Sequence, residues 1–160
     1  MEKERKPVVL VPGGIMPAQL SYGALLPVLG DDVRTVAKEL EVYAGDAPPP
    51  DYGLELEVAG IARAADAAGL RDFHLIGYSA GGASALAFAA RYPERLRSLA
   101  LIEPAWIGNE GLTSEEKADL AELDRVVALP PDERMRAFLR WQMRPGVDPP
   151  VLLGSGAPPP

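Results

Sequence analysis

The chain has 160 residues, enough for one domain with a buried core, and its 48% hydrophobic and 24% charged residues are typical of a globular protein. A net charge of −7 without a basic stripe disfavours a nucleic-acid partner. With no cysteine and one histidine, the sequence excludes disulfides and thiolate or histidine-based metal sites, and we expect no metal or other cofactor.

The first part of the chain alternates short apolar runs with a helical pattern. Residues 8–11, Val-Val-Leu-Val, are typical of a buried parallel strand and are closed by Pro-Gly-Gly. This run is too short for a signal-peptide core or a membrane span, so we expect a cytoplasmic protein without a membrane partner. A helix is predicted over residues 17–29 and a second strand over 33–37, before a proline-rich loop at 45–51.

The same alternation continues through the middle of the chain. Apolar residues at helical spacing predict a helix over 54–68, with Gly69 at its C-terminal cap. A third strand is predicted over 73–76, an alanine-rich helix over 80–91 and a fourth strand over 99–102. Strands that alternate with helices predict an α/β fold, with a parallel sheet of about four strands and flanking helices.

After the fourth strand the alternation stops and two helices are predicted. Thr113-x-x-Glu116 is typical of a capping box that opens a helix to about Leu129, and a second helix begins at Pro131. The remaining residues are rich in proline and glycine, and only 151–153 could form a strand. We therefore expect three parts, residues 1–107, 108–144 and 145–160.

The most informative motif is Gly-x-Ser-x-Gly over residues 77–81, between the third strand and the helix that follows. This is the pattern of a nucleophile elbow, in which a serine stands on a strained strand-to-helix turn. The glycines are needed because a larger neighbour would collide with the backbone of so tight a turn. We therefore expect Ser79 to have a φ angle above zero.

Together these features resemble the α/β-hydrolase fold family. Residues 8–14 resemble its strand and oxyanion loop, 77–81 its elbow and 91–96 the junction after the nucleophile helix. The two later helices resemble a helical cap. The resemblance implies Ser79 as the nucleophile that cleaves an ester or similar acyl bond in a small-molecule substrate. It also implies that the backbone N–H groups of Ala80 and of Gly14 (or Ile15) stabilise the oxyanion.

One departure from the family concerns the catalytic base. The family's chain order is serine, acid, histidine, and no histidine follows Ser79. The only histidine, His74, lies five residues earlier on the same predicted strand, roughly 16 Å from Ser79, which is beyond the reach of proton transfer. Glu103, at the end of the fourth strand, is a candidate acid, although a solvated loop carboxylate is the favoured interpretation. The sequence is thus interpreted as the N-terminal portion of a hydrolase, with the C-terminal strands missing and weak or no activity.

Several alternatives stay open at this point. Ile15, Tyr78, Trp106 and Phe138 are candidates to line an acyl pocket, but Trp106 and Phe138 also suit the core of a helical pair. The chain could be a non-catalytic binding module, or a split enzyme completed by another chain. Lyase and cofactor-free oxygenation chemistries use the same fold, which does not separate them. The unpaired edge of the fourth strand predicts self-association.

Overall fold

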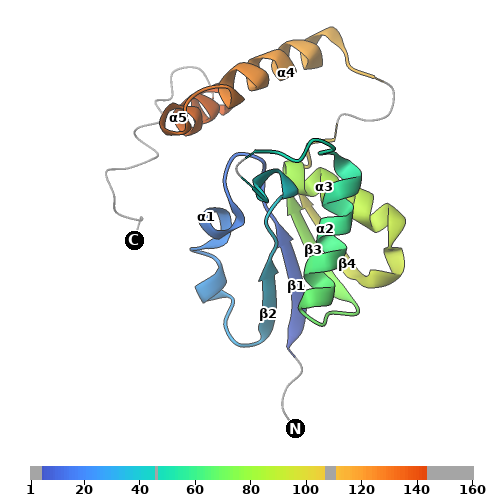
Figure 1. The fold of residues 1–160 in the computed structure, drawn as a ribbon. Helices are drawn as coiled ribbons and strands as arrows, with labels where there is room; N and C mark the ends of the chain where they lie inside the picture. Colours follow the sequence, from blue (N-terminus) through green and yellow to red (C-terminus); the bar gives the residue numbers. More distant parts are fainter. Residues whose placement is uncertain (1–4, 46, 107–110, 144–160) are drawn as a thin grey trace. The chain divides into compact units, whose positions relative to one another are not determined.

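The computed structural model describes residues 5–45, 47–106 and 111–143 (Figure 1). The chain forms two compact units, Met1–Trp106 and Ile107–Pro160. Within the described residues no helix is long and apolar enough to cross a membrane.

The first unit contains a parallel four-stranded sheet in the order β2-β1-β3-β4. The predicted α/β fold is confirmed. The second strand has its predicted bounds, and the other three extend beyond the apolar runs that predicted them, because backbone pairing continues through flanking residues such as Lys6, which pairs with Val33. Their bounds are β1 Lys6–Val11, β2 Val33–Ala37, β3 Phe73–Tyr78 and β4 Leu96–Ile102.

Two helices, α2 (Leu54–Ala67) and α3 (Ala80–Arg91), pack against one face of this sheet (Figure 1). The registers place a row of apolar side chains across that face: Val36, Val9, Leu75 and Leu99. Gly69 has a φ of +66°, as its predicted role at the end of α2 requires.

The predicted helix over residues 17–29 is wrong in its length. α1 covers only Ala18–Tyr22, and after a turn the chain forms a short 3₁₀ helix, η1, at Leu26–Val28. Pro27 explains the break, because it has no N–H to donate and disfavours a helical residue before it. Two further 3₁₀ turns that the pattern did not predict are η2 at Glu41–Tyr43 and η3 at Pro93–Arg95.

The second unit contains α4 (Ser114–Val127) and α5 (Pro131–Gln142). The predicted capping box is present: Thr113 Oγ1 accepts the Glu116 N–H at 3.2 Å, and Glu116 Oε2 accepts the Thr113 N–H at 2.7 Å. These bonds from Thr113 hold the pKa of the Glu116 carboxyl below its usual range. The tail from residue 144, including the candidate strand 151–153, lies outside the described residues.

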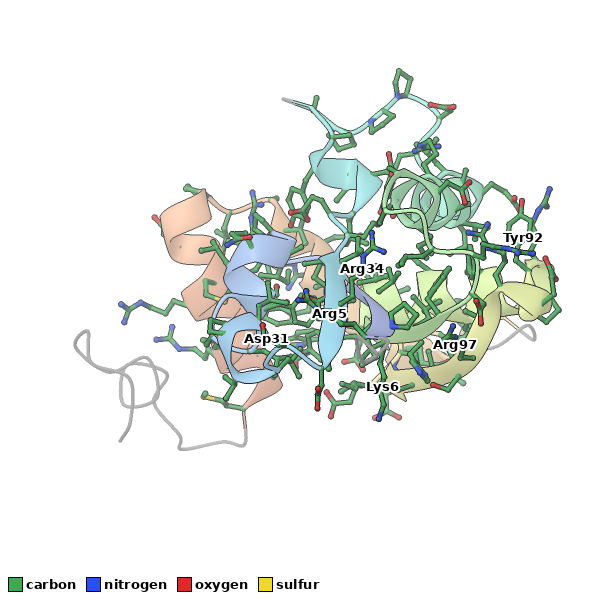
Figure 2. All side chains as sticks on the ribbon, turned by 90° about the horizontal axis from the view of Figure 1, so that it is seen from below. Arg5, Lys6, Asp31, Arg34, Tyr92 and Arg97 are labelled. Atoms are coloured by element: carbon green, nitrogen blue, oxygen red, sulfur yellow. The ribbon has the colours of Figure 1, made fainter. Side chains whose placement is uncertain are left out.

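The two ends of the parallel sheet differ in character. Seen from below, Figure 2 shows Lys6, Arg34 and Arg97 at the end where the strands begin. Arg97 pairs there with Asp72 at 2.6 Å. Ser79 follows β3 at the opposite end, where parallel sheets usually present functional groups.

Candidate active site

Ser79 stands at the junction between β3 and α3 in a strained backbone conformation. Its φ is 52° and its ψ is −118°, which is rare for a residue with a side chain. The expected positive φ is therefore confirmed. A turn of this shape lifts the serine hydroxyl out of the strand and presents it above the end of the sheet.

The segment after β4 holds this turn from the other side. The Ser79 N–H donates to the Ile102 carbonyl at 3.0 Å, and the Ala105 N–H donates to the Ser79 carbonyl at 2.9 Å. Gly82 adds to the contact, because a methyl group on it would lie 2.8 Å from Pro104 Cα. Residues 102–105 thus clamp the strained serine through its own backbone.

The glycines of the motif are needed for close approach of the backbone. A methyl group on Gly77 would collide with the Gly81 carbonyl, and one on Gly81 with the carbonyl oxygens of Pro12 and Val11. The Gly81 N–H also donates to the Pro12 carbonyl at 3.0 Å. These contacts bring residues 12–15, which we call the candidate oxyanion loop, against the start of α3.

Gly14 and Ala80, the two predicted oxyanion donors, lie side by side. A methyl group on Gly14 would be 3.5 Å from Ala80 Cβ, and one on Gly13 would be 3.4 Å from Ser79 Cβ. Within the described residues, no backbone carbonyl accepts the N–H of Gly14 or of Ala80. Two unpaired donors beside a raised serine are what stabilisation of an oxyanion requires.

Two tyrosines that the sequence analysis missed donate to backbone carbonyls here, Tyr43 to this loop and Tyr22 to the end of β1. The Tyr43 hydroxyl donates to the Gly14 carbonyl at 2.6 Å, and the Tyr22 hydroxyl donates to the Val11 carbonyl at 2.8 Å. Burial, followed by the charge of Tyr78, raises the pKa of Tyr22 to about 12, so Tyr22 keeps its proton at neutral pH. No sequence motif marks either residue, because each comes from a short helical turn remote from the Gly-x-Ser-x-Gly motif.

Glu103, the candidate acid, follows β4 directly and is exposed, with a φ of 43°. Among the described residues it has no ion pair or side-chain hydrogen bond. Its backbone lies next to Ile102, which holds Ser79, but nothing in the described structure orients its carboxylate. Its role as an acid stays a prediction.

The four candidate pocket residues fall into different units. Ile15 and Tyr78 are half-buried in the first unit, and the Tyr78 ring would be 3.0 Å from a methyl group on Gly13. Trp106, at the end of that unit, is 43% exposed. Phe138 belongs to α5, where its ring centroid lies 6.0 Å from that of Trp141. Trp141 belongs to the same helix, so this contact does not decide between a pocket residue and the core of a helical pair.

His74 has a structural partner elsewhere on the sheet. Its Nδ1 lies 2.8 Å from Ser98 Oγ, on the adjacent strand β4. The registers place both side chains on the sheet face opposite the one that α2 and α3 cover. This environment agrees with a structural histidine rather than a catalytic base.

We expect His74→Ala to leave the reaction of Ser79 with a serine-directed probe unchanged. The variant loses one exposed hydrogen bond, so its free energy of unfolding should fall by about 0.5–1.5 kcal/mol. Ser98→Ala is the matched control, with a similar loss. A large fall in labelling with the fold intact, measured by circular dichroism, would contradict the distance argument.

Comparisons with known proteins identify a matching fold family and relatives of the chain. The model of the alpha/beta hydrolase fold family matches residues 6–145. A pyrrolizixenacetamide deacetylase of Xenorhabdus hominickii is 36% identical over 99 residues, and a 2-hydroxy-6-oxo-2,4-heptadienoate hydrolase of Pseudomonas putida is 38% identical over 101 residues. These alignments cover 59% and 60% of the chain but 36% of each relative, so the chain spans about a third of their length.

Solved structures resemble the chain over a larger share of its length. A hydrolase from Pseudomonas aeruginosa superposes with a TM-score of 0.69, covering 96% of the chain and 55% of that protein at 24% identity. At this level of identity the similarity is evidence for the fold alone.

Proposed function

The chain belongs to the alpha/beta hydrolase fold family, and from this membership we propose that it carries the nucleophile of a serine hydrolase acting on an ester or similar acyl bond. One observation carries the proposal. Ser79 is held at a positive φ beside two N–H groups, those of Gly14 and Ala80, that have no backbone acceptor among the described residues.

In the proposed reaction, Ser79 Oγ attacks the acyl carbon of the substrate and loses its proton to a base. The carbonyl oxygen becomes an oxyanion, which accepts hydrogen bonds from Gly14 and Ala80. Collapse of this intermediate breaks the bond to the leaving group, which takes up a proton, and leaves an acyl-enzyme. Water then hydrolyses the acyl-enzyme, which restores the Ser79 hydroxyl and releases a carboxylic acid.

The proposal also assigns the catalytic base and the catalytic acid. His74 is the only histidine in the sequence and pairs with Ser98, so we assign the base to a group outside these 160 residues, on the same polypeptide or on another. Glu103 stays the candidate acid. The name of one relative, a deacetylase, supports acyl-bond cleavage as the reaction class, and that of the other supports hydrolysis.

The two helices of the second unit are proposed to correspond to the helical cap that the resemblance implies. Ile15, Tyr78 and Trp106 of the first unit are proposed to line the acyl pocket. A cytoplasmic location is also part of the proposal, and a chain without cysteine is compatible with that reducing compartment.

Labelling with a fluorophosphonate tests the proposed nucleophile. We expect slow phosphonylation at Ser79, detected by intact-protein and peptide mass spectrometry, and none in Ser79→Ala. The reaction is slow because the base is absent, while the oxyanion donors alone retain a residual acceleration of about 10³–10⁴ over water.

The other outcomes of this experiment discriminate among the alternatives. A folded chain that never labels at Ser79 would favour a non-catalytic binding module. Labelling as fast as in a complete hydrolase would show that these 160 residues contain a base. Acceleration on adding a second polypeptide would identify a split enzyme.

A further inference from the structure

The carbonyl group of Gly14 is held in place by a side chain from another part of the chain. The Tyr43 hydroxyl donates to it at 2.6 Å, across 29 positions of the sequence. Gly13 and Gly14 have no Cβ, so their backbone is free to adopt more conformations than other residues. A loop built on two glycines needs an external contact to keep one conformation.

The hydrogen bond from Tyr43 fixes the orientation of the peptide unit to which the Gly14 carbonyl belongs. The described peptide bonds are all trans, and in a planar trans peptide the C=O and the following N–H point in opposite directions. Holding the Gly14 carbonyl therefore fixes the direction of the Ile15 N–H and the ψ angle of Gly14. The Ile15 N–H, one of the two groups considered as the second oxyanion donor, lies in that peptide plane. The Gly14 N–H belongs to the preceding peptide and is joined to this plane through the φ and ψ angles of Gly14.

Tyr43 is itself attached to a rigid part of the first unit. It ends η2, and the Glu41 N–H at the start of η2 donates to Glu57 Oε1 of α2 at 2.7 Å. Glu57 is 2% exposed and pairs with the buried Lys38 at 2.9 Å, while Lys38 also pairs with Glu41 at 3.0 Å. Breaking a buried ion pair is costly, so these contacts hold η2 firmly against α2.

We propose that Tyr43 is a positioning residue for oxyanion stabilisation, which rests on the proposed function of Ser79. Its hydroxyl does not touch the substrate. It holds the candidate oxyanion loop in the conformation in which the N–H of Ile15, or that of the adjoining Gly14, faces the developing charge beside the Ala80 N–H. Loss of the hydroxyl should lower the rate of the chemical step more than the affinity for the probe.

Tyr22 provides a matched control for this proposal. Its hydroxyl also donates to a backbone carbonyl at the end of β1, that of Val11, at 2.8 Å. The next residue, however, is Pro12, which has no N–H. Tyr22→Phe therefore removes a hydrogen bond of the same kind from the same strand end without releasing a peptide N–H.

The experiment compares Tyr43→Phe, Tyr22→Phe and the unchanged full chain in fluorophosphonate labelling of Ser79. For Tyr43→Phe we expect the maximal labelling rate to fall about tenfold or more, with an unchanged half-saturating probe concentration. This is less than the 10²–10³ of a deleted oxyanion donor, since the N–H remains present. For Tyr22→Phe we expect a change within about twofold, although both variants should lose similar stability in urea.

Equal slowing in both variants would overturn the proposal, as would an unchanged rate in Tyr43→Phe. NMR order parameters of the Gly14 and Ile15 amides test it without any reaction. They should fall in Tyr43→Phe and stay unchanged in Tyr22→Phe. If the unchanged chain does not label, the proposed function fails, while unchanged order parameters in Tyr43→Phe would refute the positioning role separately.

Discussion

Gly81→Ala is expected to lower the free energy of unfolding by about 3 kcal/mol and to abolish labelling of Ser79. The added methyl group would collide with the Pro12 and Val11 carbonyl oxygens and lie 2.6 Å from the Val11 carbonyl carbon. These are backbone atoms of a buried strand end, which cannot rotate away as a side chain could. Relief of the collision would move the candidate oxyanion loop away from the elbow.

Gly14→Ala is the matched control. Gly14 lies on the candidate oxyanion loop, which contacts the start of α3, where Gly81 lies. Its methyl group would meet only Ala80 Cβ, at an ordinary packing distance of 3.5 Å. We expect its free energy of unfolding to stay within about 0.5 kcal/mol of the unchanged chain. Urea denaturation followed by circular dichroism measures both variants. Equal stability of the two would mean that the loop and the elbow are not in backbone contact.

The sheet and its main helices were predictable because their signals are local. Continuous apolar runs and helical spacing each act within about a dozen residues, and they placed α3 at its observed bounds. The helix predicted over residues 17–29 was too long, because its apolar spacing did not correspond to buried side chains. Its leucines matched a helical period, but Leu20 is 70% exposed and Pro27 interrupts the backbone bonding. Periodicity alone does not show whether a side chain has a partner to pack against.

The motif of the candidate site could be predicted from the sequence, but the contacts that hold the motif in place could not. A positive φ at Ser79 follows from the sterics of Gly-x-Ser-x-Gly and needs no knowledge of the rest of the fold. The clamp by residues 102–105 and the hydrogen bonds of Tyr22 and Tyr43 depend on which segments the sheet order brings together. Their partners are backbone carbonyls, which every residue carries, so no side-chain pattern identifies them.

Two buried charged side chains illustrate a second limit of prediction from the sequence. Lys38 and Glu57 would be assigned to solvent from their residue types, yet they are 5% and 2% exposed. They are buried together because Lys38 and Glu57 form an ion pair at 2.9 Å, and the Glu41 N–H donates to Glu57 as well. Burial and the negative charge of Glu57 raise the pKa of Tyr52 above its usual value, so Tyr52 adds no further negative charge beside the pair at neutral pH. Such a cluster is evident only once β2 and α2 are placed.

The first unit also has an incompletely covered surface, on the sheet face opposite α2 and α3. β4 is the last strand of the sheet, and no described strand pairs with its outer edge. On the same strand Ala100 is exposed and Ile102 is 51% exposed. Parallel sheets normally have both faces covered, and an open edge is a template for another chain.

We therefore propose that the chain self-associates through β4 at micromolar concentration. Light scattering after size exclusion should give a mass well above the 17.0 kDa of one chain. Ile102→Lys should shift the protein toward the monomer, because a charge on this strand opposes burial while the Ile102 carbonyl still accepts the Ser79 N–H. Val28→Lys is the control, since Val28 is 78% exposed on η1, away from that edge, and should leave the mass unchanged. A monomer at every concentration tested would contradict the proposal and indicate that residues outside the described ranges cover the edge.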